Sequence, residues 1–273
     1  MALIVESIYR KGLFEGEVAI VTGGATGIGY ATALELGQLG AKIAICGRRP
    51  EVLEEGAGKL KAAGIEVFHQ PCDTREVEKV DAYVKAVKAH FGRIDLLVNN
   101  AGGQFPIAAE ALSNRGFEAV VRNNLFGTWN FVSTVAREAF IPQKRGRVVN
   151  IIANIARGFP GMVHTGAARA GVENLTKTLA VEWAQHGIRV NAVAPGVIKT
   201  SGTDQYPPEI MKRALRMPMR RFGNADEVAE LVIYLLTKAA DYVTGQTVYI
   251  DGGQSLWGDV FDTAEEVPDY TPK

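Results

Sequence analysis

The chain has 273 residues, in which 30 lysines and arginines balance 30 aspartates and glutamates, and its isoelectric point is near 6.9. This balance offers no bulk electrostatic attraction to nucleic acid or to a membrane surface, so we expect neither as a partner. The two cysteines, Cys46 and Cys72, are too few for a disulfide framework and lack metal-ligand spacing, so we expect free thiols and no metal site.

The ends of the chain carry no recognisable targeting signal. The first residues lack a basic segment followed by a long apolar core, and no apolar run is long enough to span a bilayer. The last four residues are YTPK, which differ from the SKL peroxisomal signal. We therefore expect a cytoplasmic protein.

Short apolar runs alternate with helical patterns along the chain. The runs expected as strands are residues 18–21, 42–46, 66–70, 96–98, 148–152, 190–194 and 247–250. Such alternation predicts an α/β fold in which βαβ crossovers build a parallel sheet flanked by helices on both faces. No repeat or linker interrupts the pattern, so we expect one domain over residues 1–273, ending in an arm at about 256–273.

A glycine-rich turn follows the first run. Residues 22–29 read TGGATGIG and lead into a helix expected at about 30–39. Glycines let the backbone approach a ligand, and free amides at a helix start face an anion, so the turn predicts a phosphate cradle. The spacing GxxxGxG departs from the general dinucleotide fingerprint, and a tight turn without a ligand is the alternative.

Charged residues follow the second and third runs. At the end of the second strand of a dinucleotide site, an acidic residue favours NAD, whereas arginine accommodates the 2′-phosphate of NADP. Arg48 and Arg49 stand there and favour NADP(H), although a solvated loop also explains them. After the third run, Asp73 is a candidate acceptor for the adenine amino group, a helix cap, or both.

The fourth run ends in residues 99–103, NNAGG, where small residues allow backbone to pass close to a ligand and asparagines can join neighbouring strands. With this motif in register, the chain resembles the short-chain dehydrogenase/reductase family over nearly its whole length. Further matching motifs are residues 124–128 (NLFGT), 146–151 (GRVVNI), 187–191 (GIRVN), 194–196 (APG), 244–246 (TGQ) and 251–253 (DGG).

The resemblance implies a single-domain, doubly wound Rossmann fold that binds a nicotinamide dinucleotide at the carboxyl ends of its strands. The candidate cofactor-binding residues, from the motifs and the resemblance together, are Thr22, Gly23, Thr26, Gly27, Ile28, Gly29, Arg48, Arg49, Asp73, Asn99, Ala101, Gly102, Arg169, Pro195, Gly196, Ile198 and Thr200.

The family's usual catalytic residues are missing. Members carry a serine after the fifth strand and a Tyr-x-x-x-Lys on the next helix, where the tyrosine protonates the carbonyl oxygen. Here the serine position holds Ile152 or Ala153, while Thr165 and Arg169 stand at the tyrosine and lysine positions. A threonine hydroxyl is too weakly acidic to replace the phenol, and arginine stays charged. Ordinary alcohol or ketone chemistry is therefore not expected.

A narrower branch of the family shares this loss. Residues 103–105 (GQF), 158–160 (GFP) and 163–172 (VHTGAARAGV) are similar to the peroxisomal trans-2-enoyl-CoA reductases, and more distantly to the 2,4-dienoyl-CoA reductases. These enzymes use NADPH to reduce a carbon–carbon double bond conjugated to a thioester. The resemblance therefore implies an NADPH-dependent reductase acting on an enoyl-CoA.

This chemistry needs donors and positive charge at the thioester oxygen, where an enolate develops when hydride reaches the β-carbon. Thr165 and Arg169 are candidate donors. Asn124, at the family's asparagine position, is a candidate to hold a water in the proton path, and His164 is the nearby group that titrates near neutrality. The alternatives are an ion pair between Arg169 and Glu173, a helix cap at Thr165, packing of His164, and backbone bridging by Asn124.

Residues 201–222 are expected to form a variable flap over the substrate. Its cluster of basic residues either attracts the phosphates of coenzyme A or forms a solvated helix face. These residues are Lys212, Arg213, Arg216, Arg220 and Arg221. Family habit implies a homo-oligomer, either a dimer or a tetramer.

Two other functions stay open on the sequence. One is a dehydrogenase or reductase acting on an alcohol or carbonyl group, with His164 or Glu173 as a displaced acid. The other is a catalytically degenerate protein that only binds NADP(H).

Overall fold

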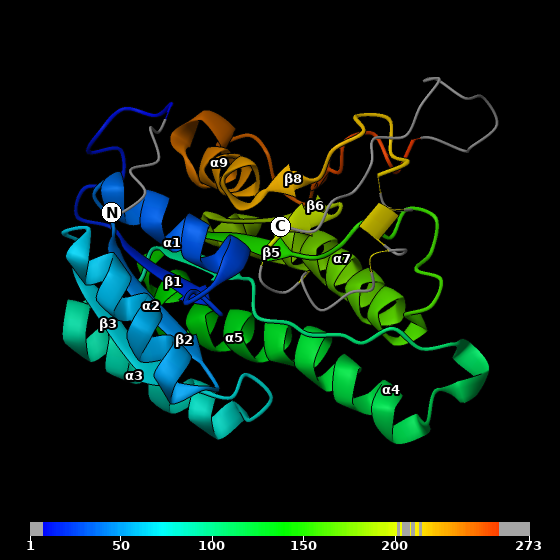
Figure 1. The fold of residues 1–273 in the computed structure, drawn as a ribbon. Coiled ribbons are helices and arrows are strands. Elements are labelled where there is room, and N and C mark those ends of the chain that lie inside the picture. The colour runs from blue at the N-terminus through cyan, green and yellow to red at the C-terminus, as the bar shows by residue number, and fades with distance from the viewer. Residues whose placement is uncertain (1–7, 201–202, 204–207, 209–210, 213–214, 257–273) are drawn as a thin grey trace.

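In the computed structural model, which describes residues 8–200, 203, 208, 211–212 and 215–256, a parallel sheet of seven strands forms the centre of the protein (Figure 1). The strand order is β3-β2-β1-β4-β5-β6-β9. The strands are β1 (Val18–Thr22), β2 (Lys42–Gly47), β3 (Val67–Pro71), β4 (Leu96–Asn99), β5 (Gly146–Ile151), β6 (Ile188–Pro195) and β9 (Thr247–Ile250). Each expected strand is present, so the doubly wound α/β fold is confirmed.

Helices connect these strands and cover both faces of the sheet. They are α1 (Gly27–Gln38), α2 (Pro50–Ala62), α3 (Val77–Phe91), α4 (Asn114–Val121), α5 (Gly127–Val135), α6 (Ile141–Gln143), α7 (Val163–Trp183) and α9 (Ala225–Leu236). Figure 1 shows α1 and α9 side by side on one face, with α3 and α5 on the other. A separate pair of short strands joins β7 (Ile198–Lys199) to β8 (Gly223–Asn224).

The core divides into two apolar layers because successive strand side chains point to opposite faces. On β2, Ile43 and Ile45 pack in the layer with α1, α2 and α9, whereas Ala44 and Cys46 pack in the layer with α3, α5 and α7. All five residues of β1 are buried. Burial from both sides explains why the strands read as continuous apolar runs instead of alternating patterns.

The order of the strands sets where a ligand can bind. Strand β1 lies between β2 and β4, and the chain builds the sheet outward from it in opposite directions. The loops that leave the carboxyl ends of β1 and β4 therefore separate and open a crevice. This is the edge that carries the glycine turn and the NNAGG motif.

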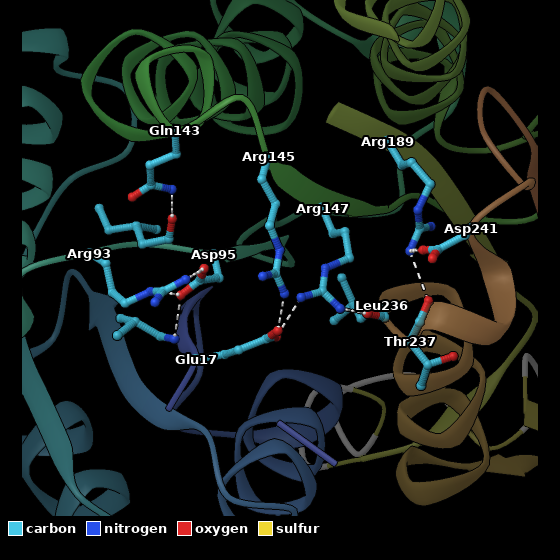
Figure 2. Close-up of polar contacts among 12 residues, drawn as sticks. Glu17, Arg93, Asp95, Gln143, Arg145, Arg147, Arg189, Leu236, Thr237 and Asp241 are labelled. Carbon is cyan, nitrogen blue, oxygen red and sulfur yellow. Dashed lines mark hydrogen bonds and ion pairs between the residues drawn. The ribbon is translucent and has the colours of Figure 1, made fainter. Parts of the chain in front are cut away.

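At the opposite, amino-terminal ends of the strands, charged pairs join neighbouring segments (Figure 2). Just before β1, the Glu17 carboxylate pairs with Arg147 of β5 at 2.5 Å and with Arg145. Just before β4, the fully buried Asp95 pairs with Arg93 at 2.5 Å and accepts the N–H of Val18 at 3.0 Å. These contacts fasten the amino ends of neighbouring strands, far from the crevice.

Of two expected segments, the flap is described in part and the arm at a single residue. In the flap at 201–222, residues 203, 208, 211–212 and 215–222 are described. The expected arm at 256–273 is described only at Leu256.

Candidate active site

The glycine turn between β1 and α1 is fixed by residues of the NNAGG motif. Asn100 Nδ2 donates to the carbonyl oxygens of Thr22 at 3.0 Å and Gly23 at 3.3 Å. The buried Thr22 hydroxyl accepts the N–H groups of Asn100 and Ala101 at 3.0 and 2.9 Å. A Cβ on Gly29 would lie 2.4 Å from both Gly23 O and Asn100 Nδ2, so only glycine fits there. The Thr22 hydroxyl therefore links the glycine turn to the NNAGG loop through hydrogen bonds.

The start of α1 is suited to an anion. Thr26 is the N-cap, and its side chain accepts no capping hydrogen bond from the described backbone of α1. The first amides of a helix lack intrahelical partners, and the helix dipole favours negative charge beside them. The amides of Gly27, Ile28 and Gly29 are thus available to a phosphate. Thr200 closes the turn from the other side, because its Cγ2 would lie 3.4 Å from a Cβ on Gly27.

A cavity of about 390 Å³ opens beside this turn. The expected cofactor residues that line it are Gly23, Thr26, Arg48, Arg49, Ala101 and Gly102. The rest of its wall consists of residues that were not expected, namely Ala25, Cys46, Gly47, Val52, Leu53, Cys72, Thr74, Asn100 and Asn123. The doubled asparagine of the NNAGG motif was the available signal for Asn100.

Arg48 and Arg49 are exposed at the mouth of the cavity, between β2 and the start of α2 at Pro50. Asp73 is engaged by Arg75, whose guanidinium lies 2.5 Å from the carboxylate and whose N–H donates to it at 3.0 Å. This hydrogen-bonded pair lowers the pKa of Asp73, and Arg48 contributes a smaller share. Since the N-cap of α3 is Glu76, Asp73 does not cap that helix.

Arg169 lies at the inner end of the crevice on α7, with 7% of its surface exposed. Its Nη1 donates to the carbonyl oxygen of Ile151 at 2.9 Å, and its Nε has no partner among the described residues. A Cβ on Gly102 would lie 2.4 Å from Nη2, so the guanidinium rests against bare backbone. Glu173 pairs instead with Lys177 at 2.8 Å. The ion-pair alternative for Arg169 is therefore wrong.

Burial lowers the pKa of Arg169 without removing its charge. The pKa of the guanidinium falls to about 10, so the group is still cationic at neutral pH. Within the described residues, no acidic side chain forms an ion pair with it. Among the residues that the structure describes, this buried positive charge therefore has no counter-ion.

Thr165 and His164 are both fully buried at the start of α7. The N-cap of that helix is Met162, so Thr165 is not the cap. His164 Nδ1 accepts the N–H of Thr165 at 2.7 Å and lies 3.2 Å from its hydroxyl. The neutral imidazole must then carry its proton on Nε2, which has no partner among the described residues. The ring packs edge-on against Phe105, 4.7 Å between centroids.

Asn124 is fully buried in a π-helical segment, Arg122–Phe126. Its Nδ2 donates to the carbonyl oxygens of Gly103 at 2.8 Å and Val120 at 2.9 Å, and its Oδ1 accepts the N–H of Gly103 at 3.3 Å. The side chain therefore bridges backbone and holds the end of the NNAGG loop. A role for Asn124 in a proton path stays a prediction.

The serine position has no hydroxyl, whether Ile152 or Ala153 occupies it. Ile152 is buried, and its N–H donates to Val193 O at 2.8 Å. Two residues further on, Asn154 Nδ2 donates to Asp251 Oδ2 at 2.9 Å. Sequence reasoning did not select this pair as functional, although Asp251 belongs to the DGG motif. Their contact joins the loop after β5 to the loop after β9.

The remaining expected residues occupy different places. Gly196 and Ile198 line a second cavity of about 60 Å³, next to the end of β6 at Pro195. Asn99 is buried, and its Nδ2 donates to Asn150 Oδ1 at 2.9 Å, which ties β4 to β5. Asn99 thus fulfils the joining role expected of asparagine in this motif.

The described basic residues of the flap differ in their surroundings. Lys212 and Arg216 are exposed, Arg220 is half-buried, and the exposed Arg221 pairs with Glu227 at 2.5 Å. Arg213 lies outside the described residues.

Comparison with known proteins places this geometry in a family. Residues 23–255 match the family model described as Enoyl-(Acyl carrier protein) reductase. The chain is 39% identical over 249 residues to the "Probable 2,4-dienoyl-CoA reductase" of Bacillus subtilis (strain 168), covering 89% of this chain and 98% of the relative. It is 36% identical to a 3-oxoacyl-(acyl-carrier-protein) reductase of Thermotoga maritima, covering 88% of this chain and 98% of the relative.

Solved structures agree. The citronellol catabolism dehydrogenase AtuB of Pseudomonas aeruginosa PAO1 is 43% identical with a TM-score of 0.83, covering 92% of this chain and 100% of that one. An actinorhodin polyketide ketoreductase with NADPH is 33% identical with a TM-score of 0.85, covering 91% and 100%. The chain therefore belongs to the short-chain dehydrogenase/reductase family, whose members use NAD(P)H, and it is an oxidoreductase.

No helix in the described part of the chain is long and apolar enough to cross a bilayer. The same part of the chain contains no group of three or more His, Cys, Asp or Glu side chains that could hold a metal ion.

Proposed function

We propose that the protein is a reductase that uses NADPH to reduce the carbon–carbon double bond of an enoyl-CoA thioester, with trans-2-enoyl-CoA as the leading substrate. One observation carries the proposal. Where the family has its acidic tyrosine and lysine, this site has the buried hydroxyl of Thr165 and the buried cation of Arg169, which forms no ion pair within the described part of the chain. The relative named as a 2,4-dienoyl-CoA reductase supports the same substrate class.

NADP(H) is the proposed cofactor, and the residues of the crevice fit it. The uncapped start of α1 suits a pyrophosphate, and the 390 Å³ cavity beside it has room for the adenosine half. Arg48 and Arg49 at its mouth carry the charge that a 2′-phosphate needs. When bound, NADPH supplies a hydride.

The chain's own residues would stabilise the charge that reduction creates. As the β-carbon of an enoyl thioester gains hydride, its carbonyl oxygen becomes an enolate oxygen. Arg169 has a buried N–H with no partner among the described residues and a full positive charge in a site of low polarity. Thr165 adds a hydroxyl donor on the same helix face. Such groups stabilise an enolate oxygen without transferring a proton to it.

A carbonyl reductase or alcohol dehydrogenase is the second candidate, favoured by the relatives named as a 3-oxoacyl reductase and a citronellol catabolism dehydrogenase. It would need an acid in place of the tyrosine. His164 Nε2 is a buried N–H that could serve, whereas Glu173 is occupied by Lys177.

The proposal of an enoyl-CoA reductase has three further parts. They are a cytoplasmic location, a homo-oligomeric state and the attraction of coenzyme A phosphates to Lys212 and Arg216.

A substrate panel tests the proposal. Purified protein is mixed with NADPH and, in turn, crotonyl-CoA, longer trans-2-enoyl-CoAs, 2,4-hexadienoyl-CoA, acetoacetyl-CoA and simple ketones, while nicotinamide absorbance is followed. We expect oxidation of NADPH with the enoyl thioesters. No turnover at any enoyl chain length, together with activity on ketones, would overturn the proposal. Tight NADPH binding without turnover on the whole panel would identify a binding protein.

Thr165→Val tests the donor role directly. The change keeps the shape of the side chain and removes its hydroxyl, so we expect kcat with crotonyl-CoA to fall about 10- to 100-fold while NADPH affinity stays unchanged. Thr178→Val is the matched control, because it makes the same substitution at an exposed position of α7. Equal kcat values for the two variants would remove Thr165 from the mechanism.

A further inference from the structure

Cys46 and Cys72 lie beside each other at the wall of the large cavity. Cys46 is the fifth residue of β2, and Cys72 follows β3 directly, where its N–H donates to Gly47 O at 3.0 Å. Both side chains belong to the same apolar layer, and both line the cavity. The proposed reduction uses neither thiol.

The two thiols influence each other's acidity. The interaction with Cys72, with burial adding to it, raises the pKa of Cys46 well above its usual value. The interaction with Cys46 lowers the pKa of Cys72, so Cys72 is the sulfur with more thiolate character. Oxidants react with the thiolate form, which makes Cys72 the first point of attack.

Tyr83 provides an independent observation at the same place. It is fully buried against Phe68 and Phe131, with ring centroids 6.0 and 5.8 Å away. Its hydroxyl has no hydrogen-bond partner among the described residues, a state that costs stability. Burial raises the pKa of Tyr83, with a smaller contribution from both cysteines, and the three residues pack in the same buried layer. An oxygen added to sulfur would give this hydroxyl an acceptor.

We propose that Cys46 and Cys72 form an oxidation site that closes to a disulfide and prevents dinucleotide binding. A hydroperoxide that enters the vacant cavity transfers an oxygen to Cys72, giving a sulfenic acid, while the peroxide is reduced to an alcohol or, from hydrogen peroxide, to water. The Cys46 sulfur then attacks the Cys72 sulfur, the S–S bond forms, and the sulfenic oxygen leaves as water. Overall, two thiols are oxidised and one hydroperoxide is reduced.

Closing this bond must move backbone on which the glycine turn depends. Cys46 is in register with Gln70, so Cys72 lies two residues further along the neighbouring strand. Paired strands lie about 4.8 Å apart and rise about 3.3 Å per residue, so this offset corresponds to Cα atoms about 8 Å apart. A disulfide joins Cα atoms only about 4.4–6.8 Å apart, so the residues after β3 have to move closer to Cys46. The carbonyl oxygen of Cys46 accepts the N–H of Gly23 at 2.8 Å, which couples that shift to the phosphate cradle.

The proposal rests on the proposed dinucleotide site but not on the substrate. Purified protein is treated with hydrogen peroxide, the oxidant is removed, and free thiols, peptide masses and NADPH affinity by calorimetry are measured. We expect both thiols to be lost, a peptide pair joined through Cys46 and Cys72, and at least tenfold weaker NADPH binding that dithiothreitol restores. NADP⁺ at 100 times its Kd should slow the oxidation by up to about 100-fold, because it occupies the cavity.

Variants separate the steps. In Cys46→Ser and Cys72→Ser, peroxide treatment should leave NADPH affinity at the value that each variant has before treatment, whatever that value is. Tyr83→Phe should slow disulfide formation without changing the NADPH affinity of the reduced protein, and Tyr242→Phe, fully exposed, is the matched control. Thiols that survive peroxide, a disulfide between two copies of the chain, or a Cys46–Cys72 bond with unchanged affinity would each overturn the proposal. Inactivity toward enoyl-CoA would leave these readouts unaffected and would count only against the proposed function.

Discussion

Replacing Arg169 with methionine should stabilise the ligand-free protein while weakening NADPH binding. The guanidinium is 7% exposed, makes one hydrogen bond to Ile151 O at 2.9 Å, and has a buried Nε without a partner among the described residues. A cation placed this way stabilises a bound anion more than it stabilises the fold. Methionine has a similar length and fills the same space without a charge.

The magnitude follows from the pKa of Arg169. Burial lowers this pKa to about 10, and at about 1.36 kcal/mol for each pKa unit the drop from the ordinary value of arginine corresponds to a cost of about 3 kcal/mol for burying the cation. Because the folded pKa is the lower one, this cost is fully present at pH 7 and is relieved only as the pH rises above about 10. The lost hydrogen bond costs about 1 kcal/mol, so we expect a net gain of about 2 kcal/mol.

Urea unfolding at pH 7 and equal protein concentration measures this gain, with and without NADPH. For a chain of this size, 2 kcal/mol corresponds to a rise in Tm of about 4–8 °C. Arg115→Met, at an exposed position of α4, is the control and should change stability by less than about 0.5 kcal/mol. A loss of 2 kcal/mol or more in the Arg169→Met variant would refute the reasoning, because it would show that the fold itself depends on the cation.

Three further changes test other parts of the structure. Replacing Arg48 and Arg49 together with alanine should reduce the preference for NADPH over NADH about 10- to 100-fold, measured as the ratio of kcat/KM values; an unchanged ratio would assign both arginines to the solvated loop. Gly102→Ala should abolish turnover in a folded protein, because its Cβ would lie 2.4 Å from the buried guanidinium, whereas Gly103→Ala should retain activity; comparable activity in the two variants would argue against the close approach. Glu17→Gln should lower the free energy of unfolding by about 2–3 kcal/mol, because it breaks ion pairs at the amino ends of the strands. NADPH affinity should stay unchanged, and a weaker affinity would show that the two ends of the strands are coupled.

The sheet could be predicted because parallel strands buried on both faces leave continuous apolar runs in the sequence. Each of the seven runs became a strand, with ends that moved by one or two residues. The glycine turn was also readable, since its strand–turn–helix context is local. Asn100 was harder to assign, because its hydrogen bonds to Thr22 and Gly23 join segments far apart in the chain.

The sequence left the environment of Arg169 open because spacing on a helix does not show which face is buried. Glu173 stands four residues after Arg169 and four before Lys177, so either ion pair was possible, and the packing against Gly102 decided between them. Asp73 was ambiguous for a related reason. Its partner Arg75 is two residues away, in a turn that neither the cap nor the adenine interpretation considered.

A competition experiment shows whether the protein reduces a carbon–carbon double bond or a carbonyl group. Equal concentrations of crotonyl-CoA and acetoacetyl-CoA are offered together with NADPH that carries deuterium at the transferred position, and the products are separated by mass spectrometry. We expect deuterium mainly in butyryl-CoA, because the site around Thr165 and Arg169 has donors for an enolate oxygen but lacks the family's phenol. Deuterium found mainly in 3-hydroxybutyryl-CoA would contradict it.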